Sequence, residues 1–204
     1  MYKIIGSPKT RAFRVMWMLE ELGEAYEVDP VPPGGKALAG INPTHKVPVL
    51  KDGEAYIIDS VAICQYLADK HKKLTFAAGT VTRAHQDSFT QFAVDEVESN
   101  LWMAAKHRFA LPEEYRVAEV KRSCHFDFDR AMRALSERLG SKTFVMGEEF
   151  TVPDVLLGHC AGWATVTGWT IPPGNVADYM SRVRTRPAFL RAWTIREATP
   201  DYAR

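Results

Sequence analysis

The chain of 204 residues has few cysteines and almost no net charge. Its three cysteines, Cys64, Cys124 and Cys160, lie far apart in the sequence. An odd number of widely spaced cysteines argues against a disulfide framework, so we expect reduced and mostly buried thiols. Lys and Arg total 26 against 25 Asp and Glu. This balance gives no reason to expect a nucleic acid or a membrane surface as a partner.

The sequence also lacks long apolar runs, internal repeats and low-complexity segments. No charged stretch followed by an apolar core precedes the first helical pattern, and the cytoplasm is therefore the expected location. His107 and His159 have no partner at the spacing of metal ligands, so we expect no metal site. Hydrophobic residues make up 46% of the chain, which is enough for one or two small domains with a core.

Residues 41–60, INPTHKVPVLKDGEAYIIDS, are the most informative stretch. Two short apolar runs, the first starting at Val47, flank a polar break with a glycine, which predicts a β-hairpin. Pro48 has no N–H to donate and must lie at the edge or start of a strand. Asp59 and Ser60 stand where the N-cap of a helix belongs, and a helix N-terminus attracts anions. An open backbone edge beside such a helix start suits a small peptide with a free carboxylate.

The elements before and after the hairpin indicate an α/β domain. Residues 2–5 alternate like a strand, 13–22 have the apolar spacing of a helix that ends at Gly23, and 25–28 form a second strand pattern. A strand, helix and strand within so short a stretch predict a parallel βαβ unit. The hairpin and a helix over 60–71 then complete the thioredoxin-like order βαβ–ββα.

Two hydroxyls stand in the turn that opens the first helix, at Ser7 and Thr10. A hydroxyl at a helix N-terminus can donate to a thiolate, and the partial charge of the helix favours that thiolate as well. Ser7 is followed by Pro8, which is a typical N-cap sequence, and Lys9 would add positive charge. The alternative is that both hydroxyls only cap the helix, which the Val47-Pro48 and Asp59-Ser60 signals disfavour. The turn contains no cysteine, so a dithiol redox mechanism is not expected there.

The stretch Asn42 to Leu50, followed by Asp59-Ser60 at a helix start, resembles the cytosolic glutathione transferases. The pattern in that family is N-P-x-G-K-V-P-x-L, a turn, and then E/D-S at a helix start. His45 stands where glycine is usual, but His tolerates a positive φ better than most residues. The resemblance, which covers nearly the whole chain, implies the bacterial type with a Ser/Thr hydroxyl in the active site.

The fold that this resemblance implies has two parts. An α/β thioredoxin-like domain would occupy residues 1–72 and bind glutathione. A linker over 73–79 would join it to an all-helical domain over 80–204. Family members are typically homodimers, and the resemblance implies the same partner for this chain.

By the same resemblance, each of the three residues of glutathione has its own contacts. Val47 would pair its backbone with the cysteinyl backbone of glutathione, held by a cis peptide bond to Pro48. Asp59 and Ser60 would hold the γ-glutamyl end, Asp59 through the ammonium and Ser60 through its N–H and hydroxyl. Lys46 would meet the glycyl carboxylate.

The activity that the resemblance implies is attack of the glutathione thiolate on a small apolar electrophile, as in detoxification. Thr10 matches the activating hydroxyl of serine-type members better when positions are counted back from the helix end, and Ser7 stays open. Glutathione is the co-substrate, and no metal or prosthetic group is implied. Two alternatives remain: glutathione-dependent reduction of peroxides or disulfides, and a non-catalytic binding module with this fold.

The second half of the chain has helical patterns. A long one runs over 80–110, and Pro112 is expected to start the next, which runs to about Leu139. Trp102, Met103, His107 and Arg108 lie on the long helix, which in the family faces the active cleft. These four residues would line the pocket for the electrophile, although packing or surface roles explain each of them equally well.

Thr151 and Asp154 form the sharpest local signal in this half. They match a capping box at the start of an apolar helix over 155–166, a feature that resembles the helical half of glutathione transferases. We expect Asp154→Ala to destabilise the protein by about 1 kcal/mol. Arginines 182, 184 and 186 alternate and do not share one helical face, so we expect them on a solvated surface.

Overall fold

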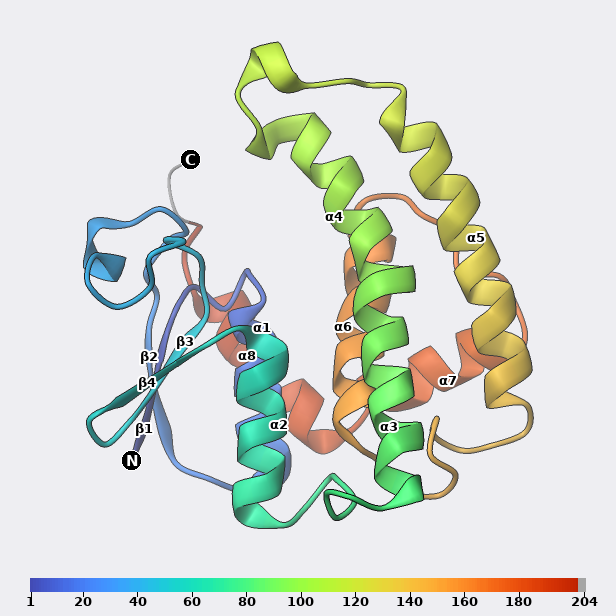
Figure 1. Cartoon of the computed structure of the whole chain (residues 1–204), viewed down its shortest axis with the longest axis horizontal. Helices are drawn as coiled ribbons and strands as arrows, with labels where there is room; N and C mark the ends of the chain where they lie inside the picture. The colour runs from blue at the N-terminus through green and yellow to red at the C-terminus, as the bar shows by residue number, and fades with distance from the viewer. Residues whose placement is uncertain (202–204) are drawn as a thin grey trace. The chain divides into compact units, whose positions relative to one another are not determined.

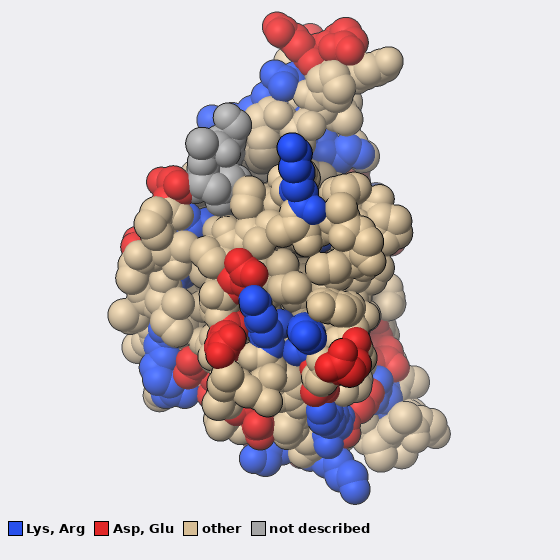
Figure 2. Space-filling view, turned by 90° about the vertical axis from the view of Figure 1, so that its left-hand side faces the viewer, with Lys and Arg blue, Asp and Glu red and all other residues tan. Residues whose placement is uncertain are grey.

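The computed structural model describes residues 1–201 and divides the chain into two compact units (Figure 1). The first unit holds residues 1–77 together with the chain from Arg184 onward, and the second holds residues 78–183. Within the described residues, no helix is both long and apolar enough to cross a membrane. Over the face shown in Figure 2, basic and acidic side chains are interspersed rather than gathered by sign.

The first unit is built on a four-stranded sheet with the order β2-β1-β3-β4. Its strands are β1 (Tyr2–Ile5), β2 (Tyr26–Asp29), β3 (Val49–Asp52) and β4 (Ala55–Ile58). β1 pairs with β2 in parallel and with β3 antiparallel, and β3 pairs antiparallel with β4. The predicted βαβ unit and hairpin are therefore confirmed, and the fold is that of a thioredoxin-like domain followed by helices.

Three α-helices belong to this unit: α1 (Ala12–Leu22), α2 (Ser60–His71) and α8 (Pro187–Ala198). A short 3₁₀ helix, η1 (Lys36–Leu38), lies in the loop before β3. α1 ends at Gly23, which has a φ of 77° and donates its N–H to the carbonyl of Leu19, as expected of a glycine after a helix. α1 is buried along most of its length, which makes it the central helix of the unit.

Aromatic rings join α8 to α1. Phe13 and Trp17 of α1 meet Phe189 edge to face, with ring centroids 5.4 and 4.9 Å apart. Trp193 stacks on Phe189 at 5.7 Å. This packing explains why the last helix groups with the first unit, although it follows the helical half in sequence.

The prediction that the three alternating arginines lie on a solvated surface is wrong for two of them. Arg186 forms a two-point ion pair with Glu21 of α1, with both N–O distances 2.7 Å. The Nε of Arg184 is buried, and its guanidinium lies 5.6 Å from the ring centroid of Phe189. Arg182 is exposed, as expected. The spacing of the arginines shows only which of them share a face of one helix. It does not show that Arg184 and Arg186 pack against other parts of the unit, and this packing covers them.

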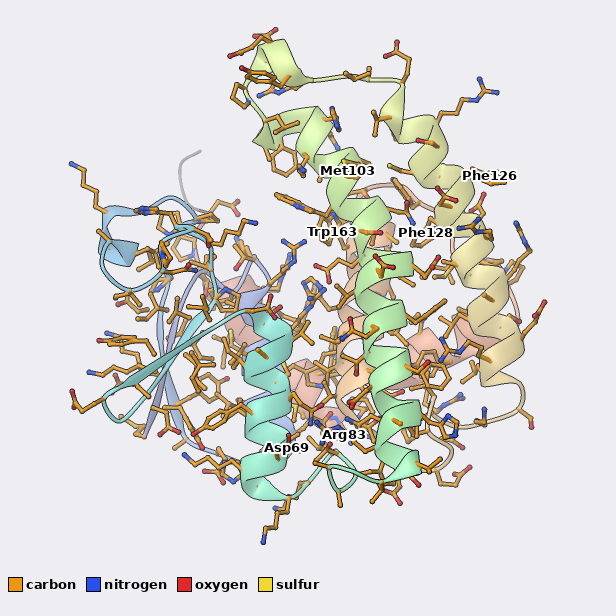
Figure 3. All side chains as sticks on the ribbon, viewed as in Figure 1. Asp69, Arg83, Met103, Phe126, Phe128 and Trp163 are labelled. Carbon is orange, nitrogen blue, oxygen red and sulfur yellow. The ribbon has the colours of Figure 1, made fainter. Side chains whose placement is uncertain are left out.

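The second unit begins with a nearly continuous helical segment, which confirms the helix predicted over 80–110. It consists of α3 (Val81–Phe92), a π-helical turn η2 (Ala93–Glu98), α4 (Ser99–Ala105) and a second π-helical turn η3 (Lys106–Ala110). The remaining elements are η4 (Glu113–Tyr115), α5 (Val120–Leu139), α6 (Val152–Val166) and α7 (Asn175–Arg184). In Figure 3, Phe128 of α5 points into the unit, where it is 1% exposed, whereas Phe126 points outward.

The prediction that a helix starts at Pro112 is wrong, because α5 begins only at Val120. A single 3₁₀ turn follows Pro112, and the chain then becomes extended at Arg116. The guanidinium of Arg116 donates to two carbonyls at the end of the preceding helical segment, and the N–H of Val117 donates to Nδ1 of His107 at 3.0 Å. These bonds tie the chain back to η3 and prevent the helix from continuing.

The capping box at the start of α6 is confirmed. Oδ2 of Asp154 accepts from the N–H and hydroxyl of Thr151, at 2.8 and 3.1 Å. Oδ1 accepts from the N–H of Val145 at 3.1 Å and from the hydroxyl of Tyr179 at 2.7 Å. Asp154 is fully buried, and this burial raises its pKa to about 6. The cap therefore joins three separate parts of the unit.

Candidate functional site

The turn between β1 and α1 lies directly against the Val47–Pro48 segment. Gly6 has a φ of 145°, and a Cβ at this position would lie 2.9 Å from Cβ of Val47 and 3.4 Å from Cα of Pro48. A glycine is therefore required, because any side chain would push the two segments apart. The contact brings Ser7, which follows Gly6, close to the backbone at Val47.

The two hydroxyls of this turn have different environments. Oγ1 of Thr10 donates to the carbonyl of Ser7 at 2.7 Å and accepts from the N–H of Ala12 at 3.2 Å. Oγ of Ser7 accepts from the N–H of Lys9 at 3.3 Å, and its own proton is uncommitted among the described residues. Ser7 is 1% exposed, whereas Thr10 is half-buried. Thr10 is thus the more accessible hydroxyl, and Ser7 is the one whose proton is free to be donated.

The Val47–Pro48 peptide bond is cis, as the resemblance predicts. The loop before it is held by Asn42, which is 3% exposed. Its side chain accepts from the N–H and hydroxyl of Thr44 and donates to the carbonyl of Lys46 at 2.8 Å. These bonds fix the backbone that leads into Val47 and leave the Lys46 side chain exposed.

His45 adopts the conformation that the glycine of the family pattern would adopt. Its φ is 52°, in the left-handed region, and its carbonyl accepts from the N–H of Gly34 at 2.8 Å. The prediction that histidine keeps this turn is therefore confirmed.

Asp59 and Ser60 form the N-terminus of α2. Oδ1 of Asp59 accepts from the N–H groups of Val61 and Ala62, at 2.9 and 3.1 Å. Asp59 has a φ of 72°, which is uncommon for a residue with a side chain and costs about 1–3 kcal/mol. Its second carboxylate oxygen has no partner among residues 1–201 and is exposed with the rest of the side chain. An acid held in this way can cap the helix and receive a cation at the same time.

Arg14 is a residue of this site that the sequence analysis missed. It is 1% exposed, and its Nη1 donates to Oγ of Ser60 at 3.3 Å. Because a guanidinium has only donors, the Ser60 hydroxyl must accept from it, and its own proton is left for another acceptor. The signal was present, since Arg14 interrupts the apolar run of α1 where a surface arginine would not be expected.

A second missed contact reaches the turn from the end of the chain. Nζ of Lys9 lies 2.8 Å from Oδ1 of Asp201. Both residues belong to the first unit, so the segment after α8 returns to the turn that carries the two hydroxyls. No sequence pattern links residues so far apart.

The four residues expected to line an electrophile pocket lie on α4 and η3 of the second unit. Trp102 is half-buried, and its ring lies 6.5 Å from that of Trp163 of α6. Met103 is 39% exposed, and Arg108 is also exposed. His107 accepts the N–H of Val117 and so helps to end the helical segment.

All three cysteines are free and buried, as expected. Burial raises the pKa of the Cys64 thiol to about 12 and also raises that of Cys124. Such thiols are poor nucleophiles at neutral pH, because they remain protonated. In residues 1–201, no group of three or more His, Cys, Asp or Glu side chains is arranged to hold a metal ion.

Comparison with known proteins supports the resemblance in the first unit. Residues 2–74 match the sequence model of the family described as "Glutathione S-transferase, N-terminal domain". Elongation factor 1-gamma 1 of Oryza sativa subsp. japonica is 27% identical over 124 residues, which cover 57% of this chain and 28% of that protein. A probable glutathione S-transferase of the same plant, GSTF2, is 27% identical over 199 residues, which cover 89% of this chain and 87% of that protein.

Solved structures resemble the whole chain. A glutathione transferase from Methylococcus capsulatus str. Bath has a TM-score of 0.85 at 22% identity and covers 98% of this chain and 100% of its own. The glutathione transferase URE2P8 from Phanerochaete chrysosporium, solved with oxidized glutathione, has a TM-score of 0.85 at 19% identity and covers 97% and 95%. The chain therefore has the glutathione transferase fold, and its residues 2–74 are similar to the N-terminal domain of that family.

Proposed function

We propose that the first unit binds glutathione and activates its thiol for attack on a small apolar electrophile. The observation that carries the proposal is the convergence of three segments: the Gly6–Ser7 turn touches Val47–Pro48, and Arg14 joins α1 to Ser60 at the start of α2. A tripeptide needs such an arrangement, because its backbone, its charged ends and its thiol must be held together.

In this proposal, the γ-glutamyl end of glutathione binds at the N-terminus of α2. The Ser60 N–H has no acceptor within the part of the chain that the structure describes, and the Ser60 hydroxyl proton is not used in the bond from Arg14. Both would donate to the γ-glutamyl carboxylate, assisted by the helix partial charge. The open carboxylate oxygen of Asp59 would accept from the ammonium.

The middle and glycyl end of glutathione would lie along the segment before β3. Val47 would pair its backbone with the cysteinyl residue, next to Pro48. Lys46 is exposed and would meet the glycyl carboxylate. Lys9 would add positive charge on the side of the first turn.

The thiol would be activated by the hydroxyl of Thr10 or Ser7. On binding, the thiol would lose its proton to solvent, and the thiolate would accept a hydrogen bond from the hydroxyl near the N-terminus of α1. The thiolate would then attack a carbon of the electrophile and form a thioether as the bond to the leaving group breaks, for example with release of chloride from a chloroarene. The free proton of Ser7 favours Ser7, and the exposure of Thr10 favours Thr10, so both belong to the proposal.

The rest of the family pattern completes the proposal. Trp102, Met103, His107 and Arg108 would line the pocket for the electrophile. The protein would act as a homodimer, the commonest symmetric assembly, and in the cytoplasm. Light scattering after size exclusion tests the dimer directly.

A non-catalytic binding module is the second candidate function. The observation that favours it is the similarity to elongation factor 1-gamma proteins. The commitment of the Thr10 proton to the carbonyl of Ser7 fits this candidate as well. Reduction of peroxides or disulfides by glutathione remains a third reaction that a hydroxyl-type site would support.

The experiment that tests the proposal measures turnover and binding on the same preparation. We expect a thioether product with glutathione and 1-chloro-2,4-dinitrobenzene, and saturable glutathione binding by calorimetry. Turnover of cumene hydroperoxide without thioether formation would favour the reductase. Glutathione binding without turnover of either compound would favour the module, and absence of binding would refute a glutathione site altogether.

A further inference from the structure

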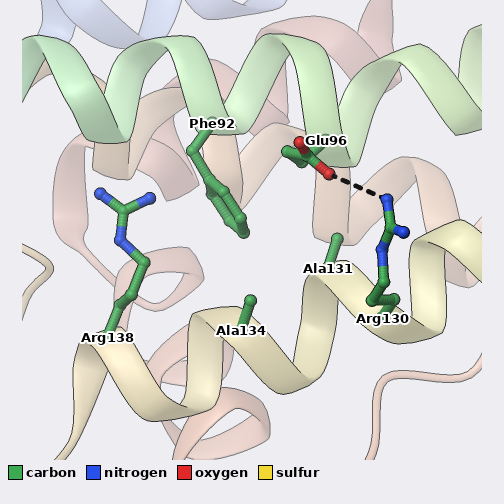
Figure 4. A pocket seen from close by; sticks show the side chains of 6 residues that line it. All are labelled: Phe92, Glu96, Arg130, Ala131, Ala134 and Arg138. Atoms are coloured by element: carbon green, nitrogen blue, oxygen red, sulfur yellow. Dashed lines mark ion pairs between the residues drawn. The ribbon is translucent and has the colours of Figure 1, made fainter.

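The pocket of the second unit, about 380 Å³ between α5 and the segment formed by α3 and η2, has no hydroxyl, thiol or imidazole in its lining (Figure 4). The lining consists of Phe92, Glu96, Arg130, Ala131, Ala134 and Arg138. Its acid is paired, because Oε2 of Glu96 lies 3.8 Å from Nη2 of Arg130. A hydroxyl with a base beside it is found instead in the first unit, at Tyr2.

Three polar side chains are joined at the start of β1 and the end of α2. The hydroxyl of Tyr2 lies 2.8 Å from Nε2 of His71, and Nδ1 of His71 lies 3.2 Å from Oε1 of Glu24. Glu24 lies in the connection between α1 and β2, so a separate element supplies each group. A nucleophile within hydrogen-bond reach of a base, which a third group orients, is the arrangement that activates hydroxyl side chains in enzymes.

This cluster of Tyr2, His71 and Glu24 lies away from the proposed glutathione site. Tyr2 begins β1, whereas Ser7 follows the end of that strand. His71 ends α2, whereas Ser60 begins it. From the rise per residue of an α-helix, the two ends of α2 are about 16 Å apart. A reaction at Tyr2 would therefore be independent of glutathione bound at the start of α2.

The tautomer of His71 follows from its two neighbours. An ionised carboxylate has no proton to donate, so Nδ1 of His71 must donate to Glu24. Nε2 then carries the lone pair, and the hydroxyl of Tyr2 must donate to it. The phenol proton is therefore directed at the atom that would remove it. The separation of 2.8 Å is within the reach that proton transfer requires.

A cation beside the phenol ring favours the same chemistry. Nζ of Lys70 lies 5.0 Å from the ring centroid of Tyr2 and forms an ion pair with Asp52. A positive charge at this range stabilises the negative charge that develops on the phenol oxygen as its proton leaves. Tyr2 itself is 6% exposed, but the side chains of Lys70 and His71 beside it are 40% and 21% exposed. A small reagent would therefore reach the hydroxyl from their side.

We propose that Tyr2 is a modification site, whose phenol accepts an acyl group from a small activated aryl ester. The phenol oxygen would attack the carbonyl carbon of the ester while Nε2 of His71 takes the phenol proton, and Glu24 would stabilise the imidazolium. The tetrahedral intermediate would then collapse, the bond from the acyl carbon to the aryloxide would break, and His71 would release its proton to solvent. The products are the Tyr2 ester, the aryloxide and a proton. This proposal does not depend on the proposed transferase activity.

The test treats the full chain with 4-nitrophenyl acetate, without glutathione, and locates the acetyl groups by mass spectrometry of its peptides. Hydroxylamine removes acetyl groups from tyrosine but not from amines, and so distinguishes Tyr2 from the amino group of Met1. Tyr115 is the internal control, because it is 66% exposed. We expect Tyr2 to be acetylated at least ~10-fold faster than Tyr115, because a positioned base assists only Tyr2. Acetylation of Tyr2 no faster than that of Tyr115 would overturn the proposal.

Variants of the other two residues of the cluster separate activation from exposure. His71→Phe keeps a ring in place of the base and should slow acetylation of Tyr2 at least ~10-fold, with Tyr115 unchanged. His85→Phe, at an exposed position of α3, is the matched control and should leave acetylation of Tyr2 unaffected. Glu24→Gln changes a half-exposed position and tests the same arrangement if His71→Phe folds poorly. It should slow acetylation of Tyr2 about threefold or more, because the imidazolium loses its anionic partner. A rate at Tyr2 that is the same in the parent and in either variant of the cluster would overturn the proposal.

Discussion

Replacement of Asp154 by alanine should be far more damaging than loss of an ordinary helix cap. The side chain is fully buried and accepts four hydrogen bonds, from two N–H groups and two hydroxyls. An ordinary cap contributes about 1 kcal/mol. Each buried hydrogen bond contributes about 1 kcal/mol net, and donors left without an acceptor add a desolvation penalty. We therefore expect Asp154→Ala to lower the free energy of unfolding by about 4 kcal/mol.

Urea denaturation followed by tryptophan fluorescence measures this loss, since Trp102, Trp163 and Trp169 all belong to the second unit. Asp178→Ala is the matched control, because Asp178 is an exposed acid beside Tyr179 on α7. The control should cost less than about 1 kcal/mol. A loss of only about 1 kcal/mol for Asp154→Ala would refute the reasoning, because it would mean that the other bonds contribute nothing.

Tyr179→Phe tests the individual bond within this network. Alone, it should cost about 1 kcal/mol, because one of the four donors to Asp154 is removed. Combined with Asp154→Ala, it should cost almost nothing further, because the acceptor is already gone. Additive losses in the double variant would show that the hydrogen bond between Tyr179 and Asp154 does not form.

Three further predictions concern ionisation. Since burial raises the pKa of Asp154 to about 6, the part of its contribution to stability that depends on its protonation is present below about pH 4 and lost as the pH rises through 6. The unfolding free energy of the parent minus that of Asp154→Asn should therefore fall by about 2–3 kcal/mol from pH 4 to 7, and a constant difference would contradict this expectation. Asp59→Asn keeps a side-chain oxygen for the helix cap and tolerates a positive φ, so we expect an unchanged melting temperature. It removes the negative charge proposed to bind the ammonium, so the dissociation constant of glutathione should rise at least ~10-fold. Equal affinity would show that Asp59 is not part of the site. All three thiols are buried, and burial raises the pKa of Cys64 to about 12. Ellman's reagent should therefore label none of the cysteines in the native protein and all three in urea. Rapid labelling of the native protein would contradict this burial.

The first unit was largely predictable from its sequence because its signals are local. Gly23 ends α1, the glycine-containing break sets the hairpin, and Asp59 starts α2, each through backbone geometry decided within a few residues. The capping box at Asp154 is equally local. Its other two partners, Val145 and Tyr179, were not predictable, because they reach the carboxylate from distant parts of the chain.

The wrong predictions also arose from contacts with distant parts of the chain. The start of α5 was misplaced because Pro112 is a good first residue for a helix, whereas the bonds of Arg116 and the N–H of Val117 to η3 end it after one turn. Arg14 and Arg186 were missed or assigned to the surface because their partners, Ser60 and Glu21, lie on other helices. A sequence pattern shows which residues share a face, and it does not show what that face meets.

Titration of the thiol of bound glutathione, followed by the ultraviolet absorbance of the thiolate, tests the central claim most directly. It should be made on the parent, on Ser7→Ala and on Thr10→Ala, each first checked for an unchanged melting temperature. We predict that bound glutathione ionises at least one pH unit below its free value in the parent, and that one of the two variants abolishes this shift. An unshifted thiol in the parent, or a shift that survives in both variants, would contradict activation by a hydroxyl of the first turn.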